Sequence, residues 1–465
     1  MTALPFVVVA GVAAALALAL RSRPRLSSIV GLVGLAACIV LALAIQPGQV
    51  STLDGGGLAT TDYQQRFLVL VSIAALGLAV AGLAAGTRRD AAGVSLAVLA
   101  AAGLTIGLVD PRAAVLAATT GGLFGVALTL VPGGPRAGAT VGIREARAVI
   151  VAGALAIAAT AWIGRDLREL DAQPVVFGLA YLAMATAVAM RFGVIPFHLW
   201  AARLADVVPE SALPVVTAIA PASLAVVALA WVDVMVVPRP VDLGIERLLV
   251  IAVALVTIVL AAVAAFVQDD LEHVLGYAIV SDAGVIVLAL AVLEPAAGPP
   301  ARTWILAFIV GRSAFAAWTA GIRTGLWTGR VADLRGWVRR SPILAAAFVV
   351  IAVAGVGFPG LAAYDARTTL VDLALDPPFS TVVLVATLAP IAYYARLFVI
   401  GVAPPDHIIE SGAGWAPVLE RMGGTGTRRW LATTWGRNRA FTTAIVAATL
   451  AVLALVTSAG VFGGR

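Results

Sequence analysis

Residues 191–200 read RFGVIPFHLW and place an arginine, a glycine, a proline and a histidine inside a long apolar run. The chain around this stretch is 61% hydrophobic and only 12% charged. A charged side chain at the centre of a membrane helix costs about 2.5–3.5 kcal/mol on insertion scales, so its presence indicates a functional role. Glycine and proline at the same place predict that the helix is interrupted there.

Apolar runs recur along the whole chain, and each is about 17–22 residues long, which is the length a helix needs to cross a bilayer core of about 30 Å. In lipid, backbone polar groups must be satisfied within the segment, and the alternating pattern of a closed barrel is absent. The predicted fold class is therefore all-α, a polytopic membrane protein. The first run, Leu4 to Leu20, has no basic residue ahead of it and is interpreted as a span rather than a cleaved signal.

The runs predict about fourteen membrane helices. They lie near residues 3–20, 27–45, 67–86, 91–109, 113–131, 146–163, 174–205, 212–236, 246–267, 273–293, 303–322, 342–375, 379–400 and 440–460. Most loop arginines fall on one side if the chain starts outside, so the positive-inside rule places both termini outside. The expected location is the inner (cytoplasmic) membrane of a cell.

Two of these runs, 174–205 and 342–375, are too long for a single span and contain helix-breaking residues. The breaking residues are Gly193 and Pro196 in the first run, and Gly357, Pro359 and Gly360 in the second. Unwound backbone at membrane depth is tolerated only where it faces protein or a water-filled cavity. The two runs cross the membrane in opposite directions about five spans apart, which is typical of an inverted repeat of five-helix units with a pathway at the breaks. A packing kink is the alternative for either break alone.

This pattern divides the chain into five parts. They are an N-terminal three-helix segment (1–90), a first five-helix repeat (91–236), a second repeat (246–400), a cytoplasmic or interfacial loop (401–439) and a C-terminal helix (440–465). One cysteine and three histidines leave no ligand set for an iron–sulfur cluster and no histidine pair for haem. We therefore expect no cofactor, no metal and no catalytic residue in this chain. The net charge of +6 is explained by loop arginines rather than by nucleic acid.

Five stretches together carry a family resemblance. RFGVIPFHLWAARLADVVPESALP (191–214) resembles the K-x-G-x-x-P-F-H-x-W-L-P signature of the antiporter-like subunits of respiratory complex I, a family shared with multisubunit cation/proton antiporters and membrane-bound hydrogenases. Four further stretches follow in the family's order: DDLEHVLGYAIVSDAG (269–284), LRGWVRRSP (334–342), GFPGLAAYDAR (357–367) and YYARLFVI (393–400), the last similar to the N-type subunit.

The resemblance implies two half-channels joined by a central row of lysines, histidines and glutamates, with proton transfer driven by redox chemistry in partner subunits. It also implies the partners: the lipid bilayer, other membrane subunits, and redox subunits with quinone and iron–sulfur centres. The chain itself would be at most a non-redox subunit of an NADH-quinone oxidoreductase-type translocase.

The sequence departs from the family pattern in its charged residues, because all 31 basic residues are arginine. Arg191 and Arg367 occupy the family's lysine positions in the two broken spans. A guanidinium group stays charged in essentially any protein setting, so these residues can anchor charge but should not relay protons. No Asp or Glu occurs between Asp110 and Glu145, and Thr119 lies near the position of the family's fifth-span glutamate. The aligned lysines of spans eight and eleven are replaced by Leu224 and Ala316.

The residues expected to form a proton path or gate are Arg191, His198, Asp282, Arg312, Asp365 and Arg367. Asp282 lies in the middle of an apolar span, where it is either a proton site, an ion-pair member or a structural hydrogen-bonding group. For Asp365 and Arg367 a structural salt bridge is favoured, and His198 is either a titrating group or a fixed polar part of its loop. Asp270, Glu272 and His273 are interpreted as a helix start, where acids are favoured by the helix dipole.

Two functions remain open from the sequence. The first is an antiporter-like subunit of a complex I-like assembly that takes part in proton translocation. The second is a structural subunit that keeps the antiporter fold with a degraded proton relay. A stand-alone transporter is disfavoured, because the resembling proteins work within multisubunit assemblies.

Overall fold

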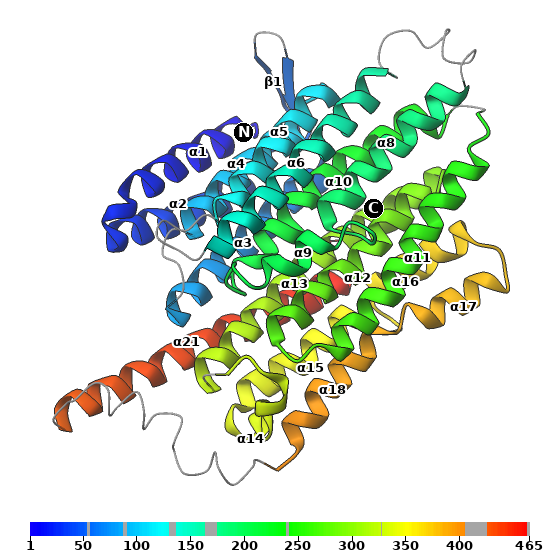
Figure 1. Ribbon diagram of the computed structural model, residues 1–465. Coiled ribbons are helices and arrows are strands. Elements are labelled where there is room, and N and C mark those ends of the chain that lie inside the picture. The colour runs from blue at the N-terminus through cyan, green and yellow to red at the C-terminus, as the bar shows by residue number, and fades with distance from the viewer. Residues whose placement is uncertain are drawn as a thin grey trace.

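The computed structural model describes residues 1–53, 56–86, 91–129, 136–162, 174–238, 241–326, 328–404 and 426–462. They form a bundle of roughly parallel and antiparallel helices, with one short hairpin at one end (Figure 1). Strands β1 (Val50–Leu53) and β2 (Gly56–Ala59) make that hairpin. The all-α prediction is confirmed, and the chain is a multi-pass membrane protein. Among the described residues, ten helices are long and apolar enough to cross a membrane. The expected count of about fourteen spans stays a prediction.

The N-terminal half of the chain contains mostly long helices. They are α1 (Leu4–Ala19), α2 (Pro24–Ala44), α3 (Asp62–Ala85), α4 (Ala91–Gly107), α5 (Pro111–Val126), α6 (Arg136–Trp162), α8 (Pro174–Phe192), the short α9 (Leu199–Leu204) and α10 (Ala220–Trp231), which lies between the π-helical turns η2 (Val215–Ile219) and η3 (Val232–Val236).

The C-terminal half of the chain contains both long and short helices. They are α11 (Gly244–Val267), α12 (Leu271–Ala291), α13 (Gly298–Leu326), α14 (Trp337–Arg340), α15 (Pro342–Val356), α16 (Ala362–Ala374), α17 (Phe379–Ala386), α18 (Pro390–Val402) and α21 (Gly426–Ser458). Helix α21 thus begins before the expected position near residue 440. Residues 405–425 of the expected interfacial loop lie outside the described residues.

Helix α13 forms the centre of the bundle. It is buried along its apolar length, whereas α1, α2 and the α17–α18 segment keep much of their surface exposed. Because lipid is as apolar as leucine, membrane helices associate through close packing of small residues rather than through a hydrophobic driving force. At Gly31 of α2, a Cβ atom would lie 2.6 Å from the Cβ of Ala92 of α4, so the two helices approach each other at glycine.

Both expected helix breaks are present. Helix α8 ends at Phe192, and the chain turns through Gly193 at φ +64° before α9 begins. Helix α15 ends at Val356, and Gly357 and Gly360 take φ values of +65° and +92° before α16 begins. Only glycine adopts this left-handed region without a steric penalty, so these residues allow the chain to leave one helix and enter the next.

Candidate functional site

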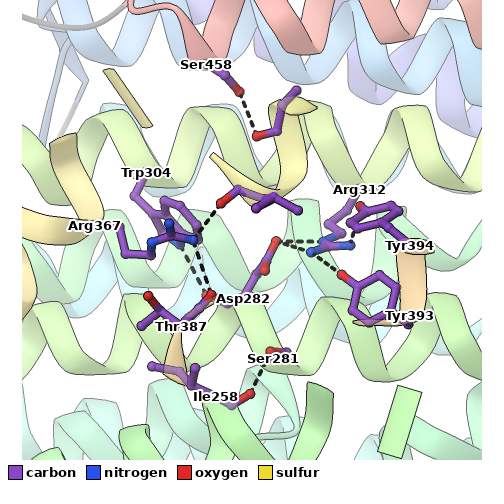
Figure 2. Close-up of polar contacts among 12 residues, drawn as sticks. Ile258, Ser281, Asp282, Trp304, Arg312, Arg367, Thr387, Tyr393, Tyr394 and Ser458 are labelled. Atoms are coloured by element: carbon purple, nitrogen blue, oxygen red, sulfur yellow. Dashed lines mark hydrogen bonds and ion pairs between the residues drawn. The ribbon is translucent and has the colours of Figure 1, made fainter. Parts of the chain in front are cut away.

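A buried ion pair lies at the centre of the second half. Arg312 of α13 donates from Nε to Oδ2 of Asp282 of α12 at 2.7 Å, and its Nη2 lies 2.5 Å from the same oxygen. The two side chains are only 1% and 7% exposed. Figure 2 shows Asp282 between two guanidinium groups, with its carboxylate turned toward Arg312. The geometry shows Asp282 as a member of an ion pair rather than as a neutral hydrogen-bonding group.

Two tyrosines of α18 complete the surroundings of Arg312. Nη2 donates to the hydroxyl of Tyr393 at 3.1 Å, and Nη1 donates to the hydroxyl of Tyr394 at 3.2 Å. All three guanidinium nitrogens are therefore hydrogen-bonded. Both tyrosines were expected only as part of the family-like stretch 393–400, so this role was not predicted. Two adjacent aromatic hydroxyls inside an apolar span were the available signal, because a buried tyrosine hydroxyl usually has a partner.

Arg367 of α16 stabilises the second helix break. Its Nη1 donates to the backbone oxygen of Val356 at 2.6 Å, and its Nη2 to that of Gly357 at 3.4 Å. The last carbonyls of a helix have no partner within the helix and carry its negative dipole, so a cation is favoured there. Arg367 also reaches the backbone oxygen of Thr387 at 3.3 Å and lies over the ring of Trp304, with Cζ 5.9 Å from its centroid. We name Asp282, Arg312, Arg367, Tyr393 and Tyr394 the second-half centre.

The expected salt bridge between Asp365 and Arg367 is wrong. Asp365 is exposed, and no ion pair among the described residues joins these two side chains. Both residues lie within the regular turns of α16, where positions two apart face different directions, so the pair would have required unwound backbone. A role of Asp365 in a proton path stays a prediction.

The first half contains a second buried centre. Arg191 at the end of α8 is 2% exposed, and its Nη1 and Nη2 have no hydrogen-bond partner among the described residues. Glu145 of α6 is 0% exposed, and both of its carboxylate oxygens likewise have none. The two side chains are close enough to interact electrostatically. We name Glu145 and Arg191 the first-half centre.

Glu145 was missed because the expected span began at residue 146, whereas α6 begins at Arg136. Its helix face could have been found from the sequence. Glu145, Ala148, Val149 and Ala152 are spaced as one stripe of a helix, and all four are buried. Glu145 therefore lies on the inner face of α6.

His198 lies in the first break and not within hydrogen-bond reach of either centre. It occupies the cap position of α9, is half-buried, and its buried Nδ1 has no hydrogen-bond partner among the described residues. A role of His198 in a proton path stays a prediction.

Side-chain contacts join the two halves near the start of α12. Arg323 of α13 contacts the carboxylates of both Glu210 and Glu272, and His273 lies 3.2 Å from Asp206. Glu210 and Asp206 belong to the segment between α9 and η2. The expected helix start is confirmed, because α12 begins at Leu271 with Asp270 at its N-cap position and Glu272 in its first turn. Asp270 makes no side-chain cap hydrogen bond, and the side chains of Glu272 and His273 also contact other elements.

A helical bundle with two interrupted helices, each beside a buried guanidinium group, is an architecture of transporter-type membrane proteins. Residues 162–391 match the protein family described as NADH:quinone oxidoreductase/Mrp antiporter, transmembrane. The chain is 32% identical over 256 residues to NADH-quinone oxidoreductase subunit N 2 of Syntrophobacter fumaroxidans. The aligned region covers 54% of this chain and 52% of the relative. It thus spans about half the length of the curated relatives it matches.

Solved structures show the same fold over more of the chain. A subunit in the structure of respiratory complex I from Thermus thermophilus matches with a TM-score of 0.71 at 18% identity, covering 97% of both chains. A subunit of the Mrp complex from Dietzia matches with a TM-score of 0.74 at 17% identity, covering 86% of this chain and 80% of that one. Residues 162–391 match this family, and the resemblance of the five sequence stretches to the antiporter-like membrane subunits of respiratory complex I is confirmed.

Proposed function

We propose that the chain is an antiporter-like membrane subunit of a complex I-like assembly and takes part in proton translocation driven by redox reactions in partner subunits. The relatives named NADH-quinone oxidoreductase subunit N and the fold shared with complex I support this assignment. The observation that carries the proton role is Asp282, a carboxylate buried beside the second helix break and bonded to a cation that cannot lose its charge.

Asp282 is the proton-exchanging group of this ion pair, because the guanidinium group of its partner Arg312 keeps its proton. When the carboxylate takes up a proton, it no longer attracts the guanidinium group. The hydroxyls of Tyr393 and Tyr394 already accept hydrogen bonds from Arg312 and continue to hold it. Arg367 stays fixed by the carbonyls of Val356 and Gly357. Protonation therefore removes the negative charge of Asp282 while Arg312 and Arg367 keep their positions.

The energies involved are of the size that coupling requires. Leaving one partner of a buried ion pair unpaired costs about 3–5 kcal/mol. Moving one elementary charge through a membrane potential of about 100 mV costs about 2.3 kcal/mol. A proton that binds Asp282 must overcome an interaction larger than the cost of moving one charge across the membrane, and a partner subunit that shifts α12 against α13 would change the proton affinity of Asp282.

The proposed setting is the inner (cytoplasmic) membrane, with both termini outside. The one-sided distribution of loop arginines supports this orientation. The proposed partners are other membrane subunits and redox subunits that carry quinone and iron–sulfur centres, whereas this chain itself carries no cofactor. The exposed apolar faces of α1, α2 and the α17–α18 segment are available for lipid and for neighbouring membrane subunits.

The test is proton uptake by the assembled complex in vesicles, measured with a pH-sensitive dye during redox turnover. We expect Asp282→Asn to abolish proton uptake while the complex still assembles. Asp372→Asn, the same change at an exposed position of α16, is the matched control and should leave uptake unchanged. Normal uptake in the Asp282→Asn complex would reject the proton role of the second-half centre.

A further inference from the structure

Glu145 and Arg191 are opposite charges that are buried in the first half without a direct contact. Arg191 is 2% exposed and Glu145 is 0% exposed. Neither the two terminal nitrogens of Arg191 nor the two oxygens of Glu145 bond to a protein group among the described residues. This differs from the second-half centre, where Arg312 bonds Asp282 directly. Burying a charged group without hydrogen bonds is strongly unfavourable, so the first-half centre needs another species to satisfy it.

Glycines of α5 form the wall of this centre. A Cβ atom at Gly122 would lie 2.8 Å from Nη2 of Arg191, and a Cβ atom at Gly125 would lie 3.8 Å from Oε1 of Glu145. Helix α5 therefore faces both charged groups with its glycines, and a side chain at Gly122 would displace the guanidinium group. Val216 in the π-helical turn η2 is the third neighbour, since it lies 3.4 Å from the Cβ position of Gly125.

The chemistry of the two groups assigns the proton to Glu145. The guanidinium of Arg191 keeps its charge, and Gly122, Gly125 and Val216 have no titratable group. Arg191 is thus the charged residue that faces Glu145. A buried water that bridges polar groups makes about three hydrogen bonds, and the unpartnered atoms of Glu145 and Arg191 provide donors and acceptors for such a bridge.

We propose that Glu145 is the proton-exchanging acid of the first half and that hydrogen-bonded water links it to Arg191. This inference rests on the proposed function and adds a residue to it. Glu145 takes the place of the glutamate that the family has on the fifth span, where this chain has the glycines of α5. A hydronium ion in this water transfers a proton to the carboxylate, which breaks one O–H bond of the hydronium ion and forms one on Glu145. The reverse transfer breaks that bond and returns the proton to water. Arg191 remains charged throughout and favours the deprotonated form.

Glu145 exchanges its proton with the inward side of the membrane, which is the side that carries most of the loop arginines. Arg144 and Arg147 flank Glu145 in the chain, and both are exposed. Their charges hold this part of α6 close to the aqueous surface, while Glu145 faces the interior.

Proton uptake in the assembled complex gives the first test. We expect Glu145→Gln to lower redox-driven proton uptake at least tenfold, because a positioned acid or base contributes about 10²–10⁴-fold to proton transfer. Glu294→Gln, the same change at an exposed glutamate, is the matched control and should have no effect. If Glu145→Gln is normal while Asp282→Asn is inactive, this inference fails and the proposed function stands. If both variants pump normally, the proposed function fails as well.

Infrared difference spectroscopy of the same complexes tests protonation directly and does not depend on pumping. We expect a carboxylic acid C=O band that moves in D₂O, disappears in Glu145→Gln and shifts in Glu145→Asp. The aspartate variant keeps an acid at this position and covers the case in which the glutamine variant does not assemble. A band that is identical in the wild type and in Glu145→Asp overturns the assignment. A high-resolution map with Glu145 and Arg191 in direct contact and no water density between them overturns the water link.

Discussion

Replacing Asp282 by asparagine leaves Arg312 charged, buried and bonded to neutral groups only. Removing one partner of a buried ion pair costs about 3–5 kcal/mol. The hydroxyls of Tyr393 and Tyr394 retain their bonds to Arg312, so we expect the lower end of this range, about 3 kcal/mol. Arg312→Gln alone leaves the carboxylate unpaired and should cost a similar amount.

The double variant Asp282→Asn/Arg312→Gln distinguishes the energy of the Asp282–Arg312 interaction from the energy lost with each side chain's other contacts. With both charges removed, an amide–amide hydrogen bond replaces the ion pair, and the double variant should be more stable than the sum of the single changes predicts. Groups in direct contact show interaction energies of about 0.5–3 kcal/mol, and the bond from Nε to Oδ2 at 2.7 Å places this pair at the upper end.

The assay is reversible unfolding of the chain in mixed detergent, followed by the fluorescence of its tryptophans. Trp304 reports on this region directly, because its indole Nε1 donates to the backbone oxygen of Asp282 at 3.2 Å. Strict additivity of the two single changes would refute the reasoning, since it would mean that Asp282 and Arg312 do not stabilise each other.

Three further predictions test the remaining geometry. Gly122→Ala should displace Arg191 and impair proton uptake, whereas Gly121→Ala, whose new methyl group would meet α4 rather than a charged group, should leave uptake unchanged; equal effects of the two would contradict the glycine wall. Arg367→Lys should lower thermal stability by about 1–3 kcal/mol, because one ammonium group cannot satisfy the same set of carbonyls. Tyr393→Phe should cost about 1.5–3 kcal/mol by the same unfolding assay, and a neutral result would show that its bond to Arg312 is unimportant.

Much of the fold follows from composition and spacing. Long apolar runs leave a helical bundle as the solution in lipid, and Gly193 and Gly357 mark the breaks because the backbone there needs positive φ. Arg191 and Arg367 stood out because a charge in such a run is costly. The boundaries of helices were less accessible: α6 begins well before its apolar part, and the polar first turns of this helix gave no hydropathy signal.

The contacts between distant segments could not be predicted from the sequence. The bond of Arg312 to Tyr393 joins residues on different helices, and only the packing of α13 against α18 decides it. Arg367 was expected to pair with its neighbour Asp365, but the carbonyls freed by the second break offered closer partners. The sequence identifies which buried residues carry charge, whereas the three-dimensional fold determines which partner each charged group binds.

Redox-driven proton uptake by the assembled complex is the most direct measurement of the central claim, with Asp282→Asn compared against Asp282→Glu. The aspartate-to-glutamate variant keeps a carboxylate beside Arg312 and should retain proton uptake, at a reduced rate. The asparagine variant should take up none while its redox partners still turn over. Equal uptake in the two variants would contradict a role for the Asp282 carboxyl group in carrying protons.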